Sequence, residues 1–373
     1  MVLLIGNYPA DRQQSMQRFA TMMLHGLRAA GIRVELIQPA PLFGNLKVGG
    51  HLVAKWLGYV DKFLLFPRRL RKVARRAAVV HVCDHSNAMY SKRVKGAPVV
   101  VTCHDLLAVR GALGEQTDCP ASVTGKMLQK WILSGLSSAT AVACDSDATL
   151  LDAERLVRRR SGKPALELIT LGLSYPYRRL EPEEVSARLG ELPQLTNSPF
   201  VLHVGSNLRR KNREGVLRIF SRCAAKWDGV LVFAGDPLAP HMRVEADELG
   251  ISDRLVEVPS PSNELLEGLY NRATALLYPS RFEGFGWPIA EAQACGCPVL
   301  CSDAEPMREV SGGAALLRQV DDEEGFAADL LRLAVESEHA IWRERSLHNA
   351  KRFDAAAMVA HYLKLYRTIG ARL

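Results

Sequence analysis

One stretch of the chain, residues 278–303, combines two carboxylates with a glycine-rich turn in YPSRFEGFGWPIAEAQACGCPVLCSD. Glu283 lies in the loop after an apolar run, and Glu291 lies about one turn into the helix expected next. Gly284 and Gly286 allow the backbone to turn tightly and to approach a ligand. The free N–H groups and the positive dipole end of that helix favour an anion. This stretch therefore indicates an anion site flanked by two carboxylates.

A run of basic residues gives a second chemical signal in HVGSNLRRKNREG, residues 203–215. An apolar run ends at Gly205, and the loop after it carries Arg209, Arg210 and Lys211 toward the start of a helix. Guanidinium and ammonium groups at the carboxyl end of a strand suit a diphosphate. The loop is therefore a candidate for holding the phosphates of a ligand.

Each of these motifs, taken alone, also has an ordinary structural explanation. Glycines after a strand commonly form turns, and Glu291 could simply complement the helix dipole. A run of basic residues is often a solvated face. Both motifs follow apolar runs, however, and ligands of open α/β sheets bind beyond the carboxyl ends of the strands. Their position favours the ligand-binding interpretation.

Polar residues also follow apolar runs in the first half of the chain. His104 and Asp105 come directly after VVVTC, Asp84 and His85 come after VVHVC, and Gly6 ends the first run. In an open α/β sheet these positions face a ligand. The alternative is that they are capping groups and ordinary loop residues.

Two patterns could suggest a metal, and we favour neither. Asp145 and Asp147 form a D-x-D after an apolar run, where they more simply cap the start of a helix. Cys295, Cys297 and Cys301 lack a fourth ligand at the usual spacing and lie across an expected strand. We therefore expect no metal site and no cofactor. The eight cysteines are expected to be buried free thiols in a reducing compartment.

The elements that must position these residues are visible as recurring short apolar runs. The runs are mostly continuous and rich in Val, Leu and Ala, which is typical of strands buried on both faces of a parallel sheet. They lie at 2–6, 34–38, 79–82, 98–103, 140–144, 166–172, 201–206, 229–236, 255–259, 274–280, 298–303 and 314–318.

Helical segments fit between these runs, for example 12–31, which stops at Gly31, and 213–227. A segment rich in charge and proline, 175–185, interrupts the pattern before it restarts. The fold class predicted is α/β with two doubly wound halves. The expected parts are a Rossmann-like domain over 1–175, a linker over 176–198, a second Rossmann-like domain over 199–352 and a closing helix over 353–373.

Composition excludes several classes of protein. Of 373 residues, 48% are hydrophobic and 24% charged, which excludes a disordered tail, a collagen-like fibre and a small disulfide scaffold. No apolar stretch approaches the ~18 residues that span a membrane. The first apolar run lacks the basic flank of a signal peptide, so a cytoplasmic protein is expected. The net charge of +8 favours anionic partners without choosing among them.

Part of that charge lies in one basic and aromatic segment, residues 55–78. Arginines and a lysine cluster over 68–76, directly after several aromatic and leucine side chains. Such a segment can dock on anionic lipid, which would make the protein peripheral on the inner face of a membrane. The alternative is a core helix with a solvated basic face.

The string EGFGWPIAEAQACGCPVLCSD resembles the signature of the retaining glycosyltransferases of family 4, which have the GT-B fold. Glu283 and Glu291 match the two glutamates of that signature, with seven residues between them, and Arg210 and Lys211 match the basic diphosphate loop of the family. The resemblance is pronounced over about 200–320 and weaker before it. Residues 353–369 also resemble the terminal helix of the family, which in this fold typically crosses back to the first domain.

The resemblance implies two Rossmann-like domains facing each other across a cleft. It implies transfer of a sugar from a nucleotide diphosphate sugar to an acceptor hydroxyl, with no metal. Glu291 would bind the ribose hydroxyls, and Glu283 would contact the donor sugar near its reacting end. Arg210 and Lys211 would stabilise the departing diphosphate. The remaining donor-binding residues would be Gly205, Gly284, Phe285 and Gly286.

On the acceptor side the resemblance implies less. His104 matches a histidine that approaches the donor sugar and the acceptor, and it would be catalytic together with Glu283, Arg210 and Lys211. Gly6, Asp84, His85 and Asp105 are further acceptor-side candidates. The chain departs from the family at Ser206, where many members have Arg, and after Gly6, where many members have a second glycine. The acceptor would be a glycan, a lipid-linked molecule or a small molecule.

Three other interpretations remain open. A phosphorylase or epimerase of the same fold is one, although no pyridoxal lysine context is evident. A catalytically silent sugar-nucleotide-binding subunit is the second. A nucleic-acid-binding protein is the third, but the chain has no recognised nucleic-acid motif, so no nucleic-acid partner is expected.

Overall fold

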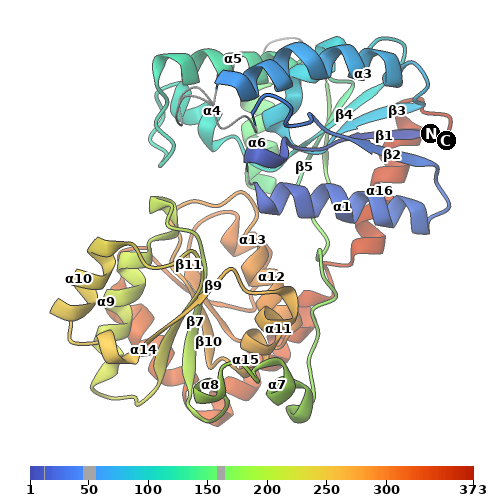
Figure 1. Cartoon of the computed structure of the whole chain (residues 1–373). Coiled ribbons are helices and arrows are strands. Elements are labelled where there is room, and N and C mark those ends of the chain that lie inside the picture. The colour runs from blue at the N-terminus through green and yellow to red at the C-terminus, as the bar shows by residue number, and fades with distance from the viewer. Residues whose placement is uncertain (12, 45–55, 158–163) are drawn as a thin grey trace. The chain divides into compact units, whose positions relative to one another are not determined.

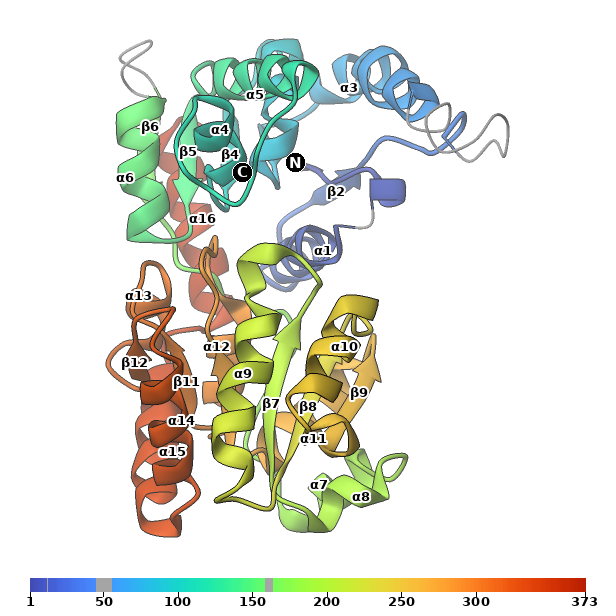
Figure 2. The same cartoon turned by 90° about the vertical axis from the view of Figure 1, so that its left-hand side faces the viewer.

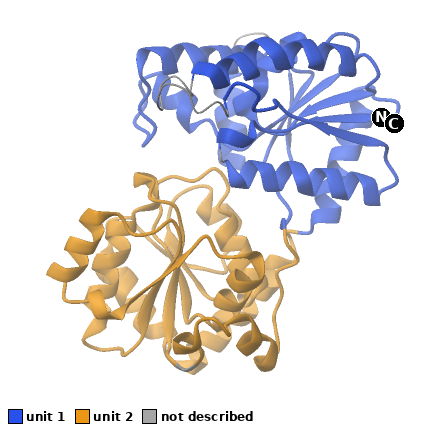
Figure 3. Ribbon diagram, viewed as in Figure 1, with its two compact units in different colours: residues 1–174, 354–373 blue, residues 175–353 orange. Residues whose placement is uncertain are grey.

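The computed structural model describes residues 1–11, 13–44, 56–157 and 164–373 (Figure 1 and Figure 2). These residues form two compact units, one of residues 1–174 with 354–373 and one of residues 175–353 (Figure 3). Each unit contains a six-stranded sheet in which all neighbouring strands are parallel. The expected pair of doubly wound α/β halves is confirmed.

Unit 1 has the strand order β2-β1-β3-β4-β5-β6, with helices on both faces of the sheet (Figure 1). Its strands are β1 (Val2–Ile5), β2 (Val34–Ile37), β3 (Val79–Val82), β4 (Val99–Cys103), β5 (Ala141–Cys144) and β6 (Ala165–Leu168). Its helices are α1 (Gln14–Ala29), α3 (Phe66–Ala74), α4 (Leu107–Ala112), α5 (Val123–Leu136), α6 (Asp147–Leu156) and α16 (Ala355–Thr368). It also has the 3-10 helices η1 (Pro9–Asp11) and η3 (His85–Arg93) and the π-helix η2 (Asp61–Leu65), which leads directly into α3.

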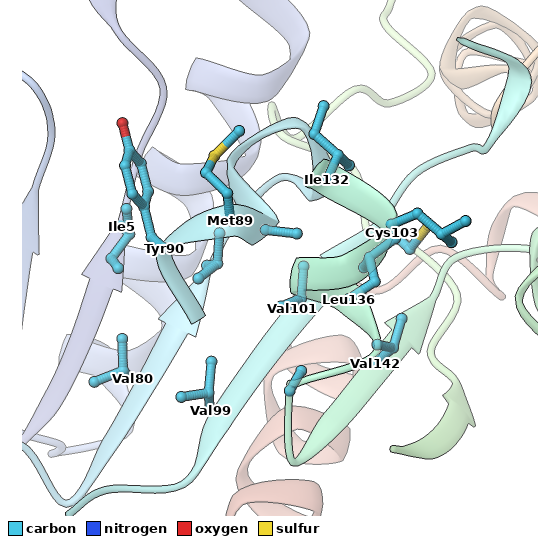
Figure 4. Close-up of a cluster of buried hydrophobic side chains, with 14 of the residues drawn as sticks. Ile5, Val80, Met89, Tyr90, Val99, Val101, Cys103, Ile132, Leu136 and Val142 are labelled. Carbon is cyan, nitrogen blue, oxygen red and sulfur yellow. The ribbon is translucent and has the colours of Figure 1, made fainter. Parts of the chain in front are cut away.

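Alternate residues of the unit 1 strands point to opposite faces, and both faces are buried. On one face, Ile5, Val80 and Val101 belong to one buried cluster with Tyr90 of η3 and Leu136 of α5 (Figure 4). Residues that alternate along a strand share one face of the sheet. The continuous apolar runs of the sequence are therefore explained by helices covering both faces.

The other face of this sheet is covered by α1 and α16, and it holds a buried polar group. The hydroxyl of Tyr366 lies 2.6 Å from His81 Nδ1, and Thr102 Oγ1 lies 2.7 Å from His81 Nε2. The Tyr362 hydroxyl lies 2.8 Å from the same threonine oxygen. Burial lowers the pKa of His81 to about 3, so the ring is neutral. These bonds join the last helix of the chain to β3 and β4.

Unit 2 has the strand order β12-β11-β10-β7-β8-β9. Its strands are β7 (Phe200–Gly205), β8 (Val230–Gly235), β9 (Leu255–Pro259), β10 (Ala275–Tyr278), β11 (Val299–Ser302) and β12 (Leu316–Arg318). Its helices are α7 (Pro182–Arg188), α8 (Pro193–Asn197), α9 (Arg213–Ala224), α10 (Pro240–Glu248), α11 (Asn263–Arg272), α12 (Trp287–Ala294), α13 (Met307–Ser311), α14 (Glu323–Leu333) and α15 (Glu336–Ala350), and its short turns are η5 (Arg209–Lys211) and η6 (Ser252–Arg254).

The core of unit 2 lies between its sheet and the helices α9 and α14. Phe233 and Leu277 of the strands pack with Phe220 of α9 and Phe326 of α14. The segment 176–198, expected as a linker, contributes α7 and α8 to this unit. Among the described residues, no helix has both the length and the apolar character needed to cross a bilayer.

Candidate functional site

The basic loop after β7 is fixed by a buried arginine at the start of α9. Arg213 is 2% exposed, and it donates from Nη2 to the backbone oxygen of Asp236 at 3.0 Å and from Nη1 to the side-chain oxygen of Asn207. The backbone N–H of Asn207 donates in turn to the Asp236 carboxylate at 2.9 Å. The Arg213 guanidinium also lies 4.7 Å from the Phe233 ring centroid. The loop is thereby held against the end of β8.

The same loop is joined to the loop after β10. Asn212 has φ 53°, a left-handed conformation that asparagine tolerates, and its side chain donates to the Pro279 backbone oxygen at 3.0 Å. The backbone N–H of Arg281 donates to the Arg210 backbone oxygen at 2.7 Å. Gly215 is needed beside Asn212, because a Cβ there would lie 2.5 Å from Asn212 Nδ2. The two loops therefore form one assembly at the carboxyl ends of neighbouring strands.

Within this assembly, Glu283 lies between two basic side chains. Its Oε2 accepts a hydrogen bond from Arg210 Nη1 at 2.5 Å, and its Oε1 accepts one from Lys211 Nζ at 2.7 Å. Arg210 Nη1 also donates to the Phe282 backbone oxygen at 3.0 Å, and Lys211 Nζ donates to the Tyr278 hydroxyl at 2.7 Å. Glu283 is 8% exposed and Lys211 is 9% exposed. The structure thus brings three of the predicted residues into direct contact.

The electrostatics of this cluster follow from burial and from the two cations. Burial by itself raises the pKa of the Glu283 carboxyl, but Lys211 and Arg210 outweigh burial and hold that pKa at about 2. Burial lowers the pKa of Lys211, and Glu283 offsets part of this effect. Burial also raises the pKa of the Tyr278 hydroxyl well above its usual range, so it remains protonated. One carboxylate facing two basic groups leaves an excess of positive charge, which suits an anion.

The second glutamate lies in α12, which begins after Gly286. Gly286 has φ 98°, a conformation that L side chains rarely adopt, so glycine is required at this turn. Glu291 is buried, and its Oε2 accepts a hydrogen bond from the Tyr270 hydroxyl at 2.9 Å. The Glu291 charge also favours the protonated form of Lys211. The two predicted glutamates therefore act on the same lysine. Glu283 contacts Lys211 directly, and Glu291 acts on it through the electrostatic field of its charge.

The remaining donor-side candidates form the walls of these loops. A Cβ at Gly205 would lie 3.2 Å from His203 Nε2, so a side chain there would crowd the end of β7. Gly284 lies half-buried in the turn before α12. Phe285 is buried and packs edge-on against Phe353, with ring centroids 5.9 Å apart.

In unit 1, His104 joins three neighbouring strand ends. Its Nδ1 lies 3.0 Å from the Asp145 carboxylate, and its Nε2 lies 3.0 Å from the Cys83 backbone oxygen. Both partners are acceptors, so the ring satisfies them only when it carries a proton on each nitrogen. Burial opposes that charge, but Asp145 outweighs burial and raises the pKa of His104. Both ring nitrogens of His104 are thus already occupied by partners within unit 1. A catalytic role for His104 stays a prediction.

The other first-half candidates make local bonds at the same edge of the sheet. The Asp84 carboxylate accepts a hydrogen bond from Asn7 Nδ2 at 2.5 Å, and His85 Nδ1 lies 3.3 Å from Asp84 Oδ1. Asp105 accepts a bond from a backbone N–H in the first turn of α4 at 3.0 Å. Gly6 directly precedes Asn7 at the end of β1. Whether these residues contact an acceptor stays a prediction.

The two patterns that could suggest a metal have other roles. The cap of α6 is Ser146, whose hydroxyl accepts a bond from the Thr149 backbone N–H at 3.2 Å, and not either aspartate of the D-x-D as expected. Asp145 instead pairs with His104, because its position at the end of β5 directs its side chain inward. All eight cysteines are free thiols, and all except Cys119 are buried. Across residues 1–11, 13–44, 56–157 and 164–373, no group of three His, Cys, Asp or Glu side chains is placed to hold a metal.

Sequence reasoning missed several residues that complete the cluster. Tyr278 is the last residue of β10, directly before the loop, so its position at a strand end could have identified it. Tyr270 contacts Glu291 only because α11 packs beside α12, and Arg213 fixes the basic loop from the helix after it. Neither of these contacts has a signal in the local sequence.

Comparisons with known proteins agree with this geometry. The family model described as glycosyl transferases group 1 matches residues 190–348, and the one described as glycosyltransferase family 4 matches residues 16–163. The O-antigen chain mannosyltransferase B of Escherichia coli is 28% identical over 257 residues, which are 65% of this chain and 65% of that protein. The chain thus spans just under two thirds of that curated relative.

Solved structures show the same fold over nearly the whole chain. Sucrose-phosphate synthase from Thermosynechococcus elongatus has a TM-score of 0.75 at 19% identity, covering 99% of this chain and 98% of that one. Anabaena HepE in complex with UDP and glucose has a TM-score of 0.74 at 14% identity, covering 98% and 99%. With both family models matched in order along its two α/β units, this chain belongs to the group 1 and family 4 glycosyltransferases and has the GT-B fold.

Proposed function

We propose that this protein moves a sugar from a nucleotide diphosphate sugar to an acceptor hydroxyl, with retention at the anomeric carbon, in the synthesis of a glycan, polysaccharide or glycolipid. The observation that carries the proposal is the buried contact of Arg210 and Lys211 with Glu283 at the carboxyl ends of β7 and β10. The HepE structure was solved with UDP and glucose, and the Escherichia coli relative is named a mannosyltransferase. Both support a nucleotide-sugar donor.

The basic residues have a defined task in such a reaction. Breaking the bond between the anomeric carbon and the diphosphate oxygen leaves negative charge on the diphosphate. Arg210 and Lys211 stabilise that charge effectively, because they are largely removed from water and are already oriented by Glu283. Two fixed cations neutralise the leaving group, so the proposal includes no metal and no cofactor.

Retention follows if the acceptor approaches the face from which the diphosphate departs. The acceptor oxygen forms the new bond to the anomeric carbon, the bond to the diphosphate oxygen breaks, and the hydroxyl proton passes to a diphosphate oxygen. A carboxylate with a pKa of about 2, as Glu283 has, is a weak general base at neutral pH. The leaving diphosphate is therefore the proton acceptor in this proposal, and Glu283 contacts the donor sugar and orients the cations.

Glu291 has the properties needed to bind the ribose of the nucleotide. A buried carboxylate accepts hydrogen bonds from two adjacent hydroxyls, and Tyr270 fixes one oxygen of Glu291 in place. The family resemblance supports this role for Glu291.

The proposal is tested first by binding. UDP-, GDP- and ADP-sugars are screened by thermal shift against the wild-type protein, Glu291→Ala and Glu257→Ala. A ligand at 100 times its dissociation constant stabilises the native state by about 2.7 kcal/mol. We expect one donor to stabilise the wild type and Glu257→Ala, and to stabilise Glu291→Ala much less. If no sugar nucleotide stabilises the wild type, the proposal fails.

Turnover then separates an enzyme from a silent binding subunit. The stabilising donor is incubated with the protein and EDTA, and released nucleoside diphosphate is measured. Release or transfer in EDTA supports the proposed metal-independent enzyme. A thermal shift without release, with or without added Mg²⁺ and Mn²⁺, would support the non-catalytic sugar-nucleotide-binding subunit instead.

We also propose that unit 1 docks on an anionic membrane surface through η2 and α3. Trp56 is 66% exposed and Leu64 is 51% exposed, so both apolar side chains are available to a membrane surface. Arg68, Arg71 and Arg75 are exposed and follow Leu64 at helical spacing, so they share one stripe, named here the outer stripe. Apolar side chains beside basic ones suit a surface of anionic headgroups.

Vesicle pelleting tests this second proposal. Each basic residue near an anionic surface contributes about 1 kcal/mol, so Arg68→Gln/Arg71→Gln should weaken binding to phosphatidylglycerol vesicles roughly 30-fold at low salt. The matched control is Lys364→Gln/Arg367→Gln, which removes two exposed charges from α16. Equal recovery of the wild type with phosphatidylcholine vesicles would exclude the docking.

A further inference from the structure

A pocket of about 460 Å³ lies in unit 1 at the amino ends of β1 and β2. Its charged walls are Arg33 and Glu35 at the start of β2, with Arg69, Lys72 and Arg76 from α3 and the turn after it. The loops discussed above begin at the carboxyl ends of the strands. In a parallel sheet the amino ends lie at the opposite edge, so this pocket is separate from those loops.

The charges of this pocket are not balanced by the described part of the chain. Four cationic side chains face a single carboxylate. Within residues 1–11, 13–44, 56–157 and 164–373, no ion pair or side-chain hydrogen bond joins any of these four cations to another residue. Like charges that are held together repel one another, and a bound anion would relieve that repulsion.

The basic residues of α3 and of the turn after it divide into two sets by their spacing. Arg69 and Lys72 are three positions apart on one face of α3, Arg76 follows in the turn after the helix, and all three line the pocket. The residues of the outer stripe are displaced from them by one position and lie outside the pocket lining. Figure 1 shows α3 beside the sheet edge at which β1 begins. The pocket is therefore a surface distinct from the outer stripe.

We propose that this pocket binds a phosphate-bearing anion, either a phosphomonoester or a diphosphate. Three arginines and one lysine, all exposed, line it. Guanidinium groups form paired hydrogen bonds to two phosphate oxygens, and an ammonium group adds a point charge. The net excess of three positive charges matches a dianion or trianion better than a single carboxylate. The phosphate belongs either to a soluble molecule or to a lipid headgroup, and the experiment separates these sources.

The soluble arm uses inorganic pyrophosphate titrated by calorimetry at constant ionic strength. It is done in the Arg210→Gln/Lys211→Gln background, so that the loop after β7 does not contribute a second diphosphate site. We expect Arg69→Gln/Lys72→Gln to weaken binding at least about tenfold. The matched control Arg68→Gln/Arg71→Gln removes the same charge from the outer stripe and should weaken binding by less than about threefold.

A gain-of-affinity variant guards against simple unfolding. Glu35→Gln removes the one carboxylate of the pocket, and it should tighten pyrophosphate binding about two- to fivefold. A variant that merely loses its fold would not bind more tightly. The melting temperature of each variant without ligand is measured alongside.

The lipid arm compares vesicles of phosphatidic acid, which carry a phosphomonoester, with vesicles of phosphatidylglycerol at equal surface charge. A preference for phosphatidic acid that Arg69→Gln/Lys72→Gln abolishes, and the outer-stripe control retains, assigns a lipid headgroup. Binding of pyrophosphate without that preference assigns a soluble ligand. Equal losses of pyrophosphate affinity in the pocket variant and the outer-stripe variant, or no binding in either arm, would overturn the proposal.

Discussion

The Lys211 ammonium lies 2.7 Å from the Glu283 carboxylate, and both side chains are buried. An ion pair removed from water is stable only while both partners remain, because the loss of one leaves an uncompensated charge. Lys211 belongs to the loop after β7 and Glu283 to the loop after β10. The pair therefore makes the geometry of each loop depend on the other.

Replacing Lys211 should reduce turnover far more than replacing its neighbour. Lys211→Gln removes a buried donor from the proposed leaving diphosphate, and we expect kcat to fall about 10²- to 10³-fold. Arg209→Gln removes the same charge from an exposed residue of the same short turn and should change kcat by less than about threefold. Initial rates of nucleoside diphosphate release check this. Similar losses in both variants would contradict a specific role for Lys211.

Removing the Tyr270 hydroxyl should affect donor binding more than the chemical step. Tyr270→Phe keeps the ring but frees one oxygen of Glu291, which we propose binds the ribose. We expect KM for the donor to rise about three- to tenfold, with kcat changed less than about twofold. A hydrogen bond to a charged group contributes about 1.5–3 kcal/mol, and relaxation of the Glu291 side chain recovers part of that loss. A fall in kcat at constant KM would place Glu291 in the chemical step instead.

The acid dependence of stability should include the Glu283 carboxyl. Its pKa is about 2 in the native state and 4.5 ordinarily, so its stabilising effect is complete above pH 4.5 and disappears as the pH falls toward 2. Glu283→Gln should melt at a lower temperature than the wild type at pH 6, and this difference should narrow between pH 4.5 and 3. Melting curves at each pH check this. A difference that stays constant would show that the pair does not stabilise the native state.

The contact of α1 with α16 should not tolerate a methyl group at Gly26. A Cβ there would lie 2.5 Å from Val359 Cγ2, closer than real atoms approach. We expect Gly26→Ala to destabilise the protein by about 1–3 kcal/mol despite the higher helix propensity of alanine. Adding Val359→Ala should recover at least part of that loss, as measured by urea unfolding followed in unit 1. Additive effects of the two substitutions would rule out the clash.

The hydroxyl of Tyr366 should be needed because it satisfies a buried histidine. Tyr366→Phe leaves His81 Nδ1 without its partner, and an unpaired buried polar group costs about 1–3 kcal/mol. The control Tyr175→Phe removes a hydroxyl whose hydrogen bond to Glu267 is long, at 3.5 Å. We expect a clearly lower urea midpoint for the first variant and little change for the second.

The strands of both sheets were predictable because their signal is local. Continuous Val- and Leu-rich runs bounded by turns indicate strands covered on both faces, and β3 (Val79–Val82) and β9 (Leu255–Pro259) match their runs to the residue. The glycines that begin or end helices, such as Gly31 with φ 75°, are likewise local features. Turn chemistry and periodicity therefore suffice to locate most strands and helices along the chain.

The partners of the site residues were not predictable in the same way. Arg210 and Glu283 are far apart in the sequence, and although each was a candidate from its own motif, neither motif shows that the two side chains meet. The bond of His104 to the Cys83 backbone oxygen depends on the order of the strands, and the sequence does not state that order. The D-x-D was wrongly expected to cap a helix, because Ser146 between the aspartates is the residue whose side chain reaches the helix N–H groups. Such choices are decided by tertiary packing.

Unit 1 is assembled from two separate parts of the chain, and this has a consequence for biosynthesis. Its sheet precedes unit 2 in the chain, whereas α16, whose Tyr366 and Tyr362 reach His81 and Thr102, follows unit 2. A nascent chain on the ribosome therefore carries a sheet face that is covered by α1 but not yet by α16 during synthesis of residues 175–353. Unit 2 is continuous and can complete its core before α16 is made. Unit 2 can thus complete its fold before unit 1, although its synthesis begins later.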